Sequence, residues 1–287
     1  MGDLGETVGI DMKKFVALLM IIGLLLPGLA IADEEQIFES GDFEYTVEGD
    51  TSRISKYTGE EVRPVLPSEF EGKPVTVIGH GAFLYHDTMV EIVLPNGVVT
   101  IEENAFLNCV SLSSLTLPEG LESIGDRAFF YDAGLREVAL PESMTAIGDH
   151  AFSGCTNLTQ ITIPKNVLSI GAGVFSESGM ANISVDEANS IFCEIDGVLF
   201  TKQDNVLHTY PAGREGDKYE VPDGTKVIGA SAFDSVTNLT EVIIPDSVIS
   251  IEAGAFAYCE NLTAIDMPEG IDIADDAFEG CEALDRR

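Results

Sequence analysis

The side chains of this chain best suited to covalent chemistry are its five cysteines, and four of them follow one rule. Cys109, Cys155, Cys259 and Cys281 each lie three residues after a phenylalanine. A thiolate at such a place could act as a nucleophile or as half of a disulfide bond. Use of one repeated slot indicates instead a shared core position, because buried cysteine packs as a small apolar residue. Cys193 lies outside this pattern and is the one candidate for an exposed thiol.

The spacing of these cysteines limits which of them could form a disulfide bond. If each repeat is one layer of a stack, successive layers lie about 4.8 Å apart. Cys109 and Cys155 are two repeats apart, at about 10 Å, which exceeds the reach of a disulfide bond. Cys259 and Cys281 lie in adjacent repeats and could be bridged in an oxidising exterior. The sequence leaves both states of that pair open.

The four histidines show no catalytic arrangement. They are scattered along the chain, at His80, His86, His150 and His208. No Ser-His-Asp set, glycine-rich phosphate loop or H-E-x-x-H motif is recognisable, and no cysteines or histidines have metal-ligand spacing. We therefore predict that the protein is not an enzyme, and that it has no catalytic, cofactor-binding or metal site.

Acidic residues also recur in register, because each of five carboxylates directly follows a regularly spaced proline. Stacked carboxylates about 5 Å apart would repel one another and could chelate Ca²⁺. The simpler interpretation is a solvated turn, and Lys165 interrupts the row. The five are Glu119, Glu142, Asp223, Asp246 and Glu269.

All of these patterns belong to one internal repeat of 23 residues. Phenylalanine, isoleucine and proline each recur at this interval, in phase, over most of the chain, with one interruption. Such self-similarity indicates a stack of small units, none of which buries its apolar face alone. The phenylalanine column comprises Phe83, Phe106, Phe129, Phe152, Phe175, Phe233, Phe256 and Phe278.

One repeat, residues 111–133, shows how each unit should fold. Leu115 and Leu117 alternate with polar residues, which predicts a short strand with one buried face. Pro118 should end that strand, because proline has no N–H for the ladder. Residues 126–130 should form a short helical or 3-10 turn that buries Phe129. Stacking such units in register predicts a long parallel sheet with ladders of like apolar residues.

The repeat resembles the BspA-like leucine-rich repeats, in which L-x-x-[IVL]-x-[IVL]-P precedes [LV]-x-x-I-G-x-x-A-F. The resemblance covers about residues 65–284. It implies a leucine-rich-repeat solenoid, β-rich, with parallel strands stacked along one axis. Members of this family are typically exported or surface-displayed and are implicated in adhesion and protein binding, so the resemblance implies the same location and activity here.

The N-terminal residues do not fit the repeat. Lys13 and Lys14 precede an uncharged run over 15–32 that ends in Ala30-Ile31-Ala32, which is typical of a cleaved secretory signal. We assign 1–32 to the signal; an uncleaved membrane anchor is the alternative. Residues 33–64 should form an N-terminal β cap over the open end of the stack. No C-terminal cap is evident in the sequence.

The repeat array is expected at 65–180 and 218–287, interrupted by an insertion at 181–217. Within the insertion, 195–201 and 206–210 read as two strands joined by a turn at 202–205, which predicts a β-hairpin. Insertions in solenoids emerge from one face, often the binding face. The resemblance weakens this one as a specific site, because similar hairpins occur inside many BspA-like arrays.

Charge and the repeat together suggest the function. A formal net charge of −34 disfavours nucleic acid and anionic membranes and favours cationic partners. We predict a secreted or cell-surface scaffold that binds an extracellular or cell-surface protein, without contact to the membrane once the signal is cleaved. The outward strand positions are the candidate contact residues: Glu91, Val93, Ser114, Thr116, Glu137, Ala139, Gln160, Thr162, Glu241, Ile243, Ala264 and Asp266.

An alternative function is a structural surface or matrix component. Such a protein would self-associate through the C-terminal end of the stack, with calcium as a candidate stabilising ion in the acidic rows.

Overall fold

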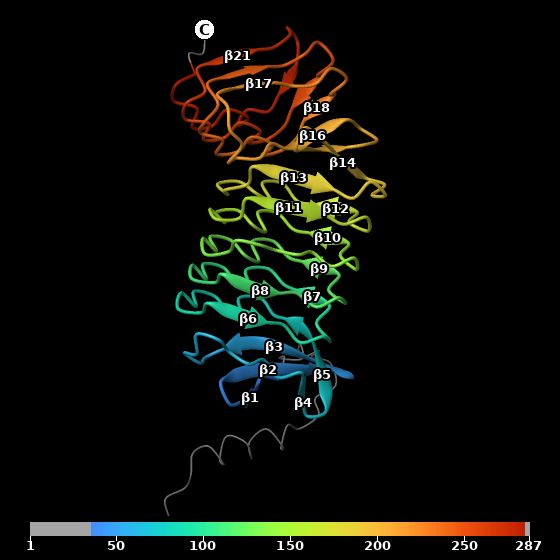
Figure 1. Cartoon of the computed structure of the whole chain (residues 1–287), viewed down its shortest axis with the longest axis vertical. Helices are drawn as coiled ribbons and strands as arrows, with labels where there is room; N and C mark the ends of the chain where they lie inside the picture. The colour runs from blue at the N-terminus through green and yellow to red at the C-terminus, as the bar shows by residue number, and fades with distance from the viewer. Residues whose placement is uncertain (1–35, 285–287) are drawn as a thin grey trace, which may run out of the picture. The chain divides into compact units, whose positions relative to one another are not determined.

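Stacked coils that carry short parallel strands make up most of this structure (Figure 1). It is a computed structural model that describes residues 36–284. The predicted signal, residues 1–32, lies outside the described residues. Within 36–284 we find no helix with the length and apolar character needed to cross a membrane.

The first strands form an antiparallel meander that joins the stack. Strands β1 (Phe38–Ser40), β2 (Phe43–Glu48) and β3 (Thr51–Tyr57) pair antiparallel, and β3 then pairs parallel with β5 (Lys73–Ile78). A short strand, β4 (Glu69–Phe70), lies antiparallel to β5. The meander therefore occupies the edge of the sheet that β5 would otherwise leave unpaired.

The coils contribute strands to two series, and the paired strands of each series are parallel and in register. The first series carries the isoleucine column: β7 (Thr100–Ile101), β9 (Ser123–Ile124), β10 (Ala146–Ile147), β12 (Ser169–Ile170), β18 (Val227–Ile228), β20 (Ser250–Ile251) and β22 (Asp272–Ile273). The second series, here called the strand face, comprises β6 (Glu91–Val93), β8 (Ser114–Thr116), β11 (Gln160–Ile163), β13 (Asn182–Val185), β17 (Lys218–Glu220), β19 (Glu241–Ile243) and β21 (Ala264–Asp266). The predicted solenoid of stacked parallel strands is confirmed.

The phenylalanine column forms two ladders of stacked rings in the core. Ring centroids of Phe106 and Phe129 are 5.1 Å apart, and those of Phe129 and Phe152 are 5.3 Å apart, with nearly parallel planes. Tyr57 continues the first ladder next to Phe83, and Tyr210 opens the second by stacking on Phe233. The repeat interval therefore places the aromatic rings at the spacing of the coils.

The predicted short helical turns are not confirmed, because the described residues contain no helix. At 126–130 the chain forms successive turns, in which the amides bond alternately within their own coil and to the next coil. The Ala128 N–H bonds to Gly125 in its own coil, whereas the Phe129 N–H bonds to Ala151 in the next coil. The segment therefore forms separate turns closed within the coil, and the amides between them bond to the next coil. Arg127 and Tyr131 accordingly have positive φ angles, 52° and 61°.

The insertion contains two strands more than the single predicted hairpin, and one of them, β13, belongs to the strand face. Strands β14 (Phe192–Ile195), β15 (Val198–Thr201) and β16 (Val206–Thr209) form two consecutive antiparallel hairpins. Strand β16 then pairs parallel with β18 and so starts the second run of coils. Cys193, predicted to be exposed, lies on β14 and is partly buried.

A glycine between two coils gives a direct test of this packing. Gly154 has φ +76°, and a Cβ there would lie 2.2 Å from the Tyr131 ring, whose hydroxyl donates to Glu177 at 3.0 Å. We expect Gly154→Ala to lower the free energy of unfolding by about 1–2 kcal/mol from the left-handed backbone alone, plus the cost of displacing the ring. Denaturation of Gly154→Ala with and without Tyr131→Ala separates the two costs. Equal costs in both backgrounds would mean that the ring does not limit this position.

Candidate functional site

The predicted contact residues occupy the outward positions of the strand face. On each strand the middle residue points into the core; Ile92, Ile161 and Val242 are almost fully buried, for example. The residues on either side point outward, and Val93 and Ile243 are 55% and 36% exposed. Ten of the twelve predicted residues lie on described strands of this face, and Glu137 and Ala139 lie on the coil between β8 and β11.

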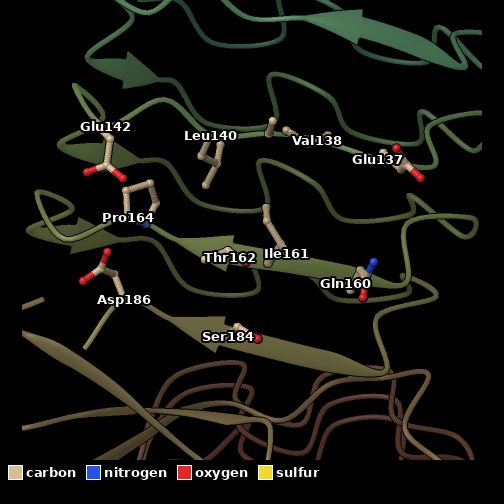
Figure 2. A pocket seen from close by; sticks show the side chains of 11 residues that line it. Glu137, Val138, Leu140, Glu142, Gln160, Ile161, Thr162, Pro164, Ser184 and Asp186 are labelled. Atoms are coloured by element: carbon tan, nitrogen blue, oxygen red, sulfur yellow. The ribbon is translucent and has the colours of Figure 1, made fainter. Parts of the chain in front are cut away.

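A groove of about 500 Å³ crosses this face over three consecutive coils (Figure 2). Four predicted residues line it: Glu137, Ala139, Gln160 and Thr162. Small side chains form its floor, because Ala139, Thr162 and Ser184 occupy equivalent outward positions in three successive coils. The outward side chains of these three coils therefore form a shallow channel across the strands.

Sequence reasoning missed the part of the groove that β13 provides. Ser184 and Asp186 line it, and β13 pairs with β11 in the register Thr162↔Ser184. Residues 181–217 were assigned to the insertion, but the alternation over Asn182–Val185 already indicates one more strand of the face. Glu142, predicted only as a member of an acidic row, also lines the groove.

The coil at one side of the groove departs from the regular ladder. Residues 136–140 form no strand, although every other described coil from β6 to β21 has one at this position. Among the described residues, no hydrogen bond ties the backbone of 136–140 to β8 or to β11. Here the strand face is therefore interrupted, between the β6–β8 pair and the β11–β13 pair.

The charged groups around the groove are mainly carboxylates. Glu142 and Asp186 lie on one side with Pro164 between them, and Glu137 lies toward the other side (Figure 2). Glu142 pairs with Lys165 at 3.3 Å, and an Asp186 oxygen accepts the Ala188 N–H at 2.8 Å. No ion pair involves Glu137 or Asp186 within the described part of the chain. The groove is therefore rich in acceptors and suits donors that carry positive charge.

The acidic rows show no metal-binding geometry in the described structure. No three or more histidine, cysteine or acidic side chains gather there into a group able to hold a metal ion. The acidic residues of the row therefore remain separate carboxylates on turns, and Glu142 is paired with Lys165.

The column cysteines are buried thiols rather than nucleophiles. Each Sγ contacts the carbonyl of the ladder aromatic in the preceding coil; Cys155 Sγ lies 3.2 Å from Phe129 O, and Cys259 Sγ lies 3.0 Å from Phe233 O. Burial raises the pKa of the Cys155 thiol well above its usual range. Cys259 and Cys281 are both thiols in this structure, with no disulfide bond between them. This column therefore contributes to packing and not to a reactive site.

A second hollow lies at the first coil, between β6 and the chain before β4. Val65 is 88% exposed there and Val93 is its partner in a parallel bridge, while Arg63 pairs with Glu91 at 3.0 Å. This hollow is more apolar than the groove and continues the same outward face.

Comparison with known proteins gives a consistent result. A model of the "BspA type Leucine rich repeat region" matches residues 76–205 and 215–286 in six copies. No curated protein matches the chain significantly. Several solved structures are similar to it, among them three that each cover most of both chains.

A leucine-rich cell surface protein from Faecalibacterium prausnitzii is 30% identical, covers 88% of each chain and has a TM-score of 0.53. The pneumococcal vaccine antigen PcpA is 24% identical over 83% of this chain and 71% of its own, with a TM-score of 0.64. A leucine-rich repeat protein from Eubacterium ventriosum is 22% identical over 85% and 75%, with a TM-score of 0.65. The latter two similarities concern the fold alone.

Proposed function

Because this chain belongs to the BspA-type leucine-rich repeat family, we propose that it is an exported scaffold that binds a partner protein at the cell surface through its strand face. The observation that carries the proposal is the groove over 137–142, 160–164 and 184–186, which coincides with outward positions of the repeat. A shallow channel with small side chains on its floor suits an extended segment rather than a compact small molecule.

The charge of the groove suggests the chemistry of the partner. Glu137, Glu142 and Asp186 surround it, Lys165 is the cation that pairs at its rim, and the whole chain carries a formal net charge of −34. We infer that the partner presents an extended segment with lysine or arginine side chains. Such a segment would gain charge-assisted hydrogen bonds and faster association at low salt.

Surface location is supported by similarity rather than by the groove. The F. prausnitzii structure, 30% identical to this chain, is described as a leucine-rich cell surface protein. The basic and apolar segment before residue 33 supports export of this chain. A repeat scaffold of this kind needs no catalytic centre, so we propose binding and not catalysis as its activity.

The proposal is tested by blocking the groove. The full chain is immobilised and probed with purified matrix, mucin and cell-surface proteins, and the same panel is applied to the double variant Ala139→Arg/Thr162→Arg. We expect a retained partner whose Kd rises at least tenfold in the variant, because the new side chains fill the channel and add positive charge.

A matched control introduces arginine away from this face. Ser169 on β12 is exposed and belongs to the other strand series, so Ser169→Arg should leave the Kd unchanged. Circular dichroism and the melting temperature show whether each variant is folded. Retention of no protein by the wild type, or equal retention by the groove variant, would contradict the proposal.

A further inference from the structure

One carboxylate lies fully inside the core, in the slot that other coils fill with cysteine. Asp132 is 0% exposed and lies three residues after Phe129 in the ladder. Its Oδ1 accepts the N–H of Cys109 at 2.7 Å. Its Oδ2 is also buried, and no hydrogen-bond partner for it is present among the described residues. A buried carboxylate with an unsatisfied oxygen is costly, so this position requires an explanation.

The neighbouring coils show what this slot does. In five described coils the side chain in this slot contacts the carbonyl oxygen of the ladder aromatic in the preceding coil. Val236 and Ser178 also occupy the slot and do not make that contact. Cys109 Sγ lies 3.1 Å from Phe83 O, and Cys155 Sγ lies 3.2 Å from Phe129 O. Cys259, Cys281 and, through Nε2, His86 make the corresponding contacts. In the two coils next to Asp132 the slot is thus a donor position, and for Asp132 the equivalent acceptor is Phe106 O. An ionised carboxylate has no proton to donate, whereas a carboxylic acid has one.

Nothing around Asp132 favours its charged form apart from one amide. The titratable groups packed against it are the Cys109 and Cys155 thiols from the coils on either side. Burial raises the pKa of both thiols, and a negative charge on Asp132 would raise it further. Asp87, close to Cys109, adds a further acidic group. No ion pair to Asp132 exists in the described structure. Burial raises the pKa of Asp132 well above its ordinary value of 3.8, and the Cys109 N–H opposes this only in part.

We propose that Asp132 is held as a neutral carboxylic acid that donates its proton to Phe106 O, and that its ionisation makes this coil the pH-sensitive joint of the stack. The same coil contains residues 136–140, the one segment of the strand face between β6 and β21 that lacks a strand in the described chain. Destabilisation of this coil would therefore also affect one side of the groove. An effect on binding rests on the proposed function, whereas the pH dependence of stability does not.

The direction of the pH effect follows from the raised pKa. A raised folded-state value means that the native protein holds its proton more tightly than the unfolded chain does. The stabilisation is fully present below pH 3.8, the ordinary value, and is lost progressively as pH rises toward the folded-state value. Acid thus strengthens this joint and neutral pH weakens it.

Asp132→Asn tests the proposal, because an amide has the shape of the neutral acid, donates a hydrogen bond at every pH and does not titrate. The unfolding equilibrium constants of the full-length wild type and variant are measured in urea from pH 4 to 8. We expect the wild-type constant to rise relative to the variant by up to tenfold per pH unit until the folded-state pKa is passed. Asp132→Cys introduces the cysteine found at this slot in neighbouring coils. We expect the wild-type constant to rise with pH relative to this variant as well.

Asp204→Asn, at an exposed position, is the control and should show no such slope. A ratio between wild type and Asp132→Asn that is constant with pH would overturn the proposal, as would an equal slope for Asp204→Asn. The measurement needs no binding partner, so its failure is distinguishable from failure of the proposed function.

Discussion

Replacing Phe129 by alanine is expected to lower the free energy of unfolding by about 3–5 kcal/mol, the cost of removing a fully buried aromatic side chain and leaving a cavity. The Phe129 ring is 0% exposed and stacks between Phe106 and Phe152 at 5.1 and 5.3 Å. In a stack, each coil is stabilised mainly by its two neighbours, so the loss should also weaken the coupling across this coil. Denaturation in urea, followed by circular dichroism, measures the change.

The adjacent residue provides the matched control for this prediction. Phe130 is partly exposed, lies outside the ladder and contacts Tyr131 and His150 edge-on. Phe130→Ala removes the same atoms one position away, so we expect a clearly smaller loss of stability. Equal losses at the two positions would show that the ladder is not the main support of the stack.

Replacing His208 by alanine is expected to lower the free energy of unfolding by about 1–3 kcal/mol, because it leaves a backbone carbonyl without a donor. In regular coils the carbonyl of each column isoleucine accepts a hydrogen bond from the residue that follows the column isoleucine of the next coil. The Gly171 N–H, for example, donates to Ile147 O at 2.8 Å. The insertion interrupts this pattern after Ile170, and His208 Nε2 lies 2.9 Å from Ile170 O instead. His208 thus replaces a missing backbone donor where the two runs of coils meet.

The stabilisation by His208 should depend on pH. Burial lowers the pKa of His208 below its ordinary value of 6.5, although the Ile170 carbonyl and the charge of Glu252 oppose the shift. A lowered folded-state value means that the contribution is present above pH 6.5 and is lost as pH falls through the folded-state pKa. The stability contribution of His208 thus rises with pH, whereas that of Asp132 falls with pH. Variants at the two positions therefore distinguish the two effects.

His208→Gln is the comparison for that pH dependence. Glutamine offers an N–H donor for Ile170 O but has no titrating group in this range. We expect its stability to lack the part of the wild-type decline between pH 7 and pH 5 that arises from His208. A wild type and a glutamine variant that decline in parallel would mean that His208 does not titrate in the folded protein over that range.

Much of the fold follows from the 23-residue interval alone. Parallel register, inward isoleucines and the stacked rings of Phe106, Phe129 and Phe152 are all consequences of identical units placed one coil apart. The helical form of the local turn is not confirmed, because a short segment such as 126–130 is compatible with a helix until the partners of its amides are known. Those partners, such as Ala151 O for Phe129 N–H, belong to the next coil.

The special positions could be located from the sequence but not interpreted. Asp132 occupies the cysteine slot by simple counting, yet its burial and its unsatisfied oxygen appear only when coils enclose it on both sides. His208 lies 38 residues from the carbonyl that it contacts, in a segment outside the repeat. The 23-residue repeat therefore gives no indication that His208 and Ile170 are in contact.

The sequence by itself thus determined the stack, its inward ladders and the outward residues of the strand face, because a repeat encodes contacts between equivalent positions. Only in the folded protein is it visible where the regular pattern fails. It fails at the strandless segment 136–140, at the groove beside it and at the contact of His208 with Ile170 O between the two runs of coils. These features depend on non-equivalent residues meeting across coils, and hydrogen bonds between such residues leave no periodic signal in the chain.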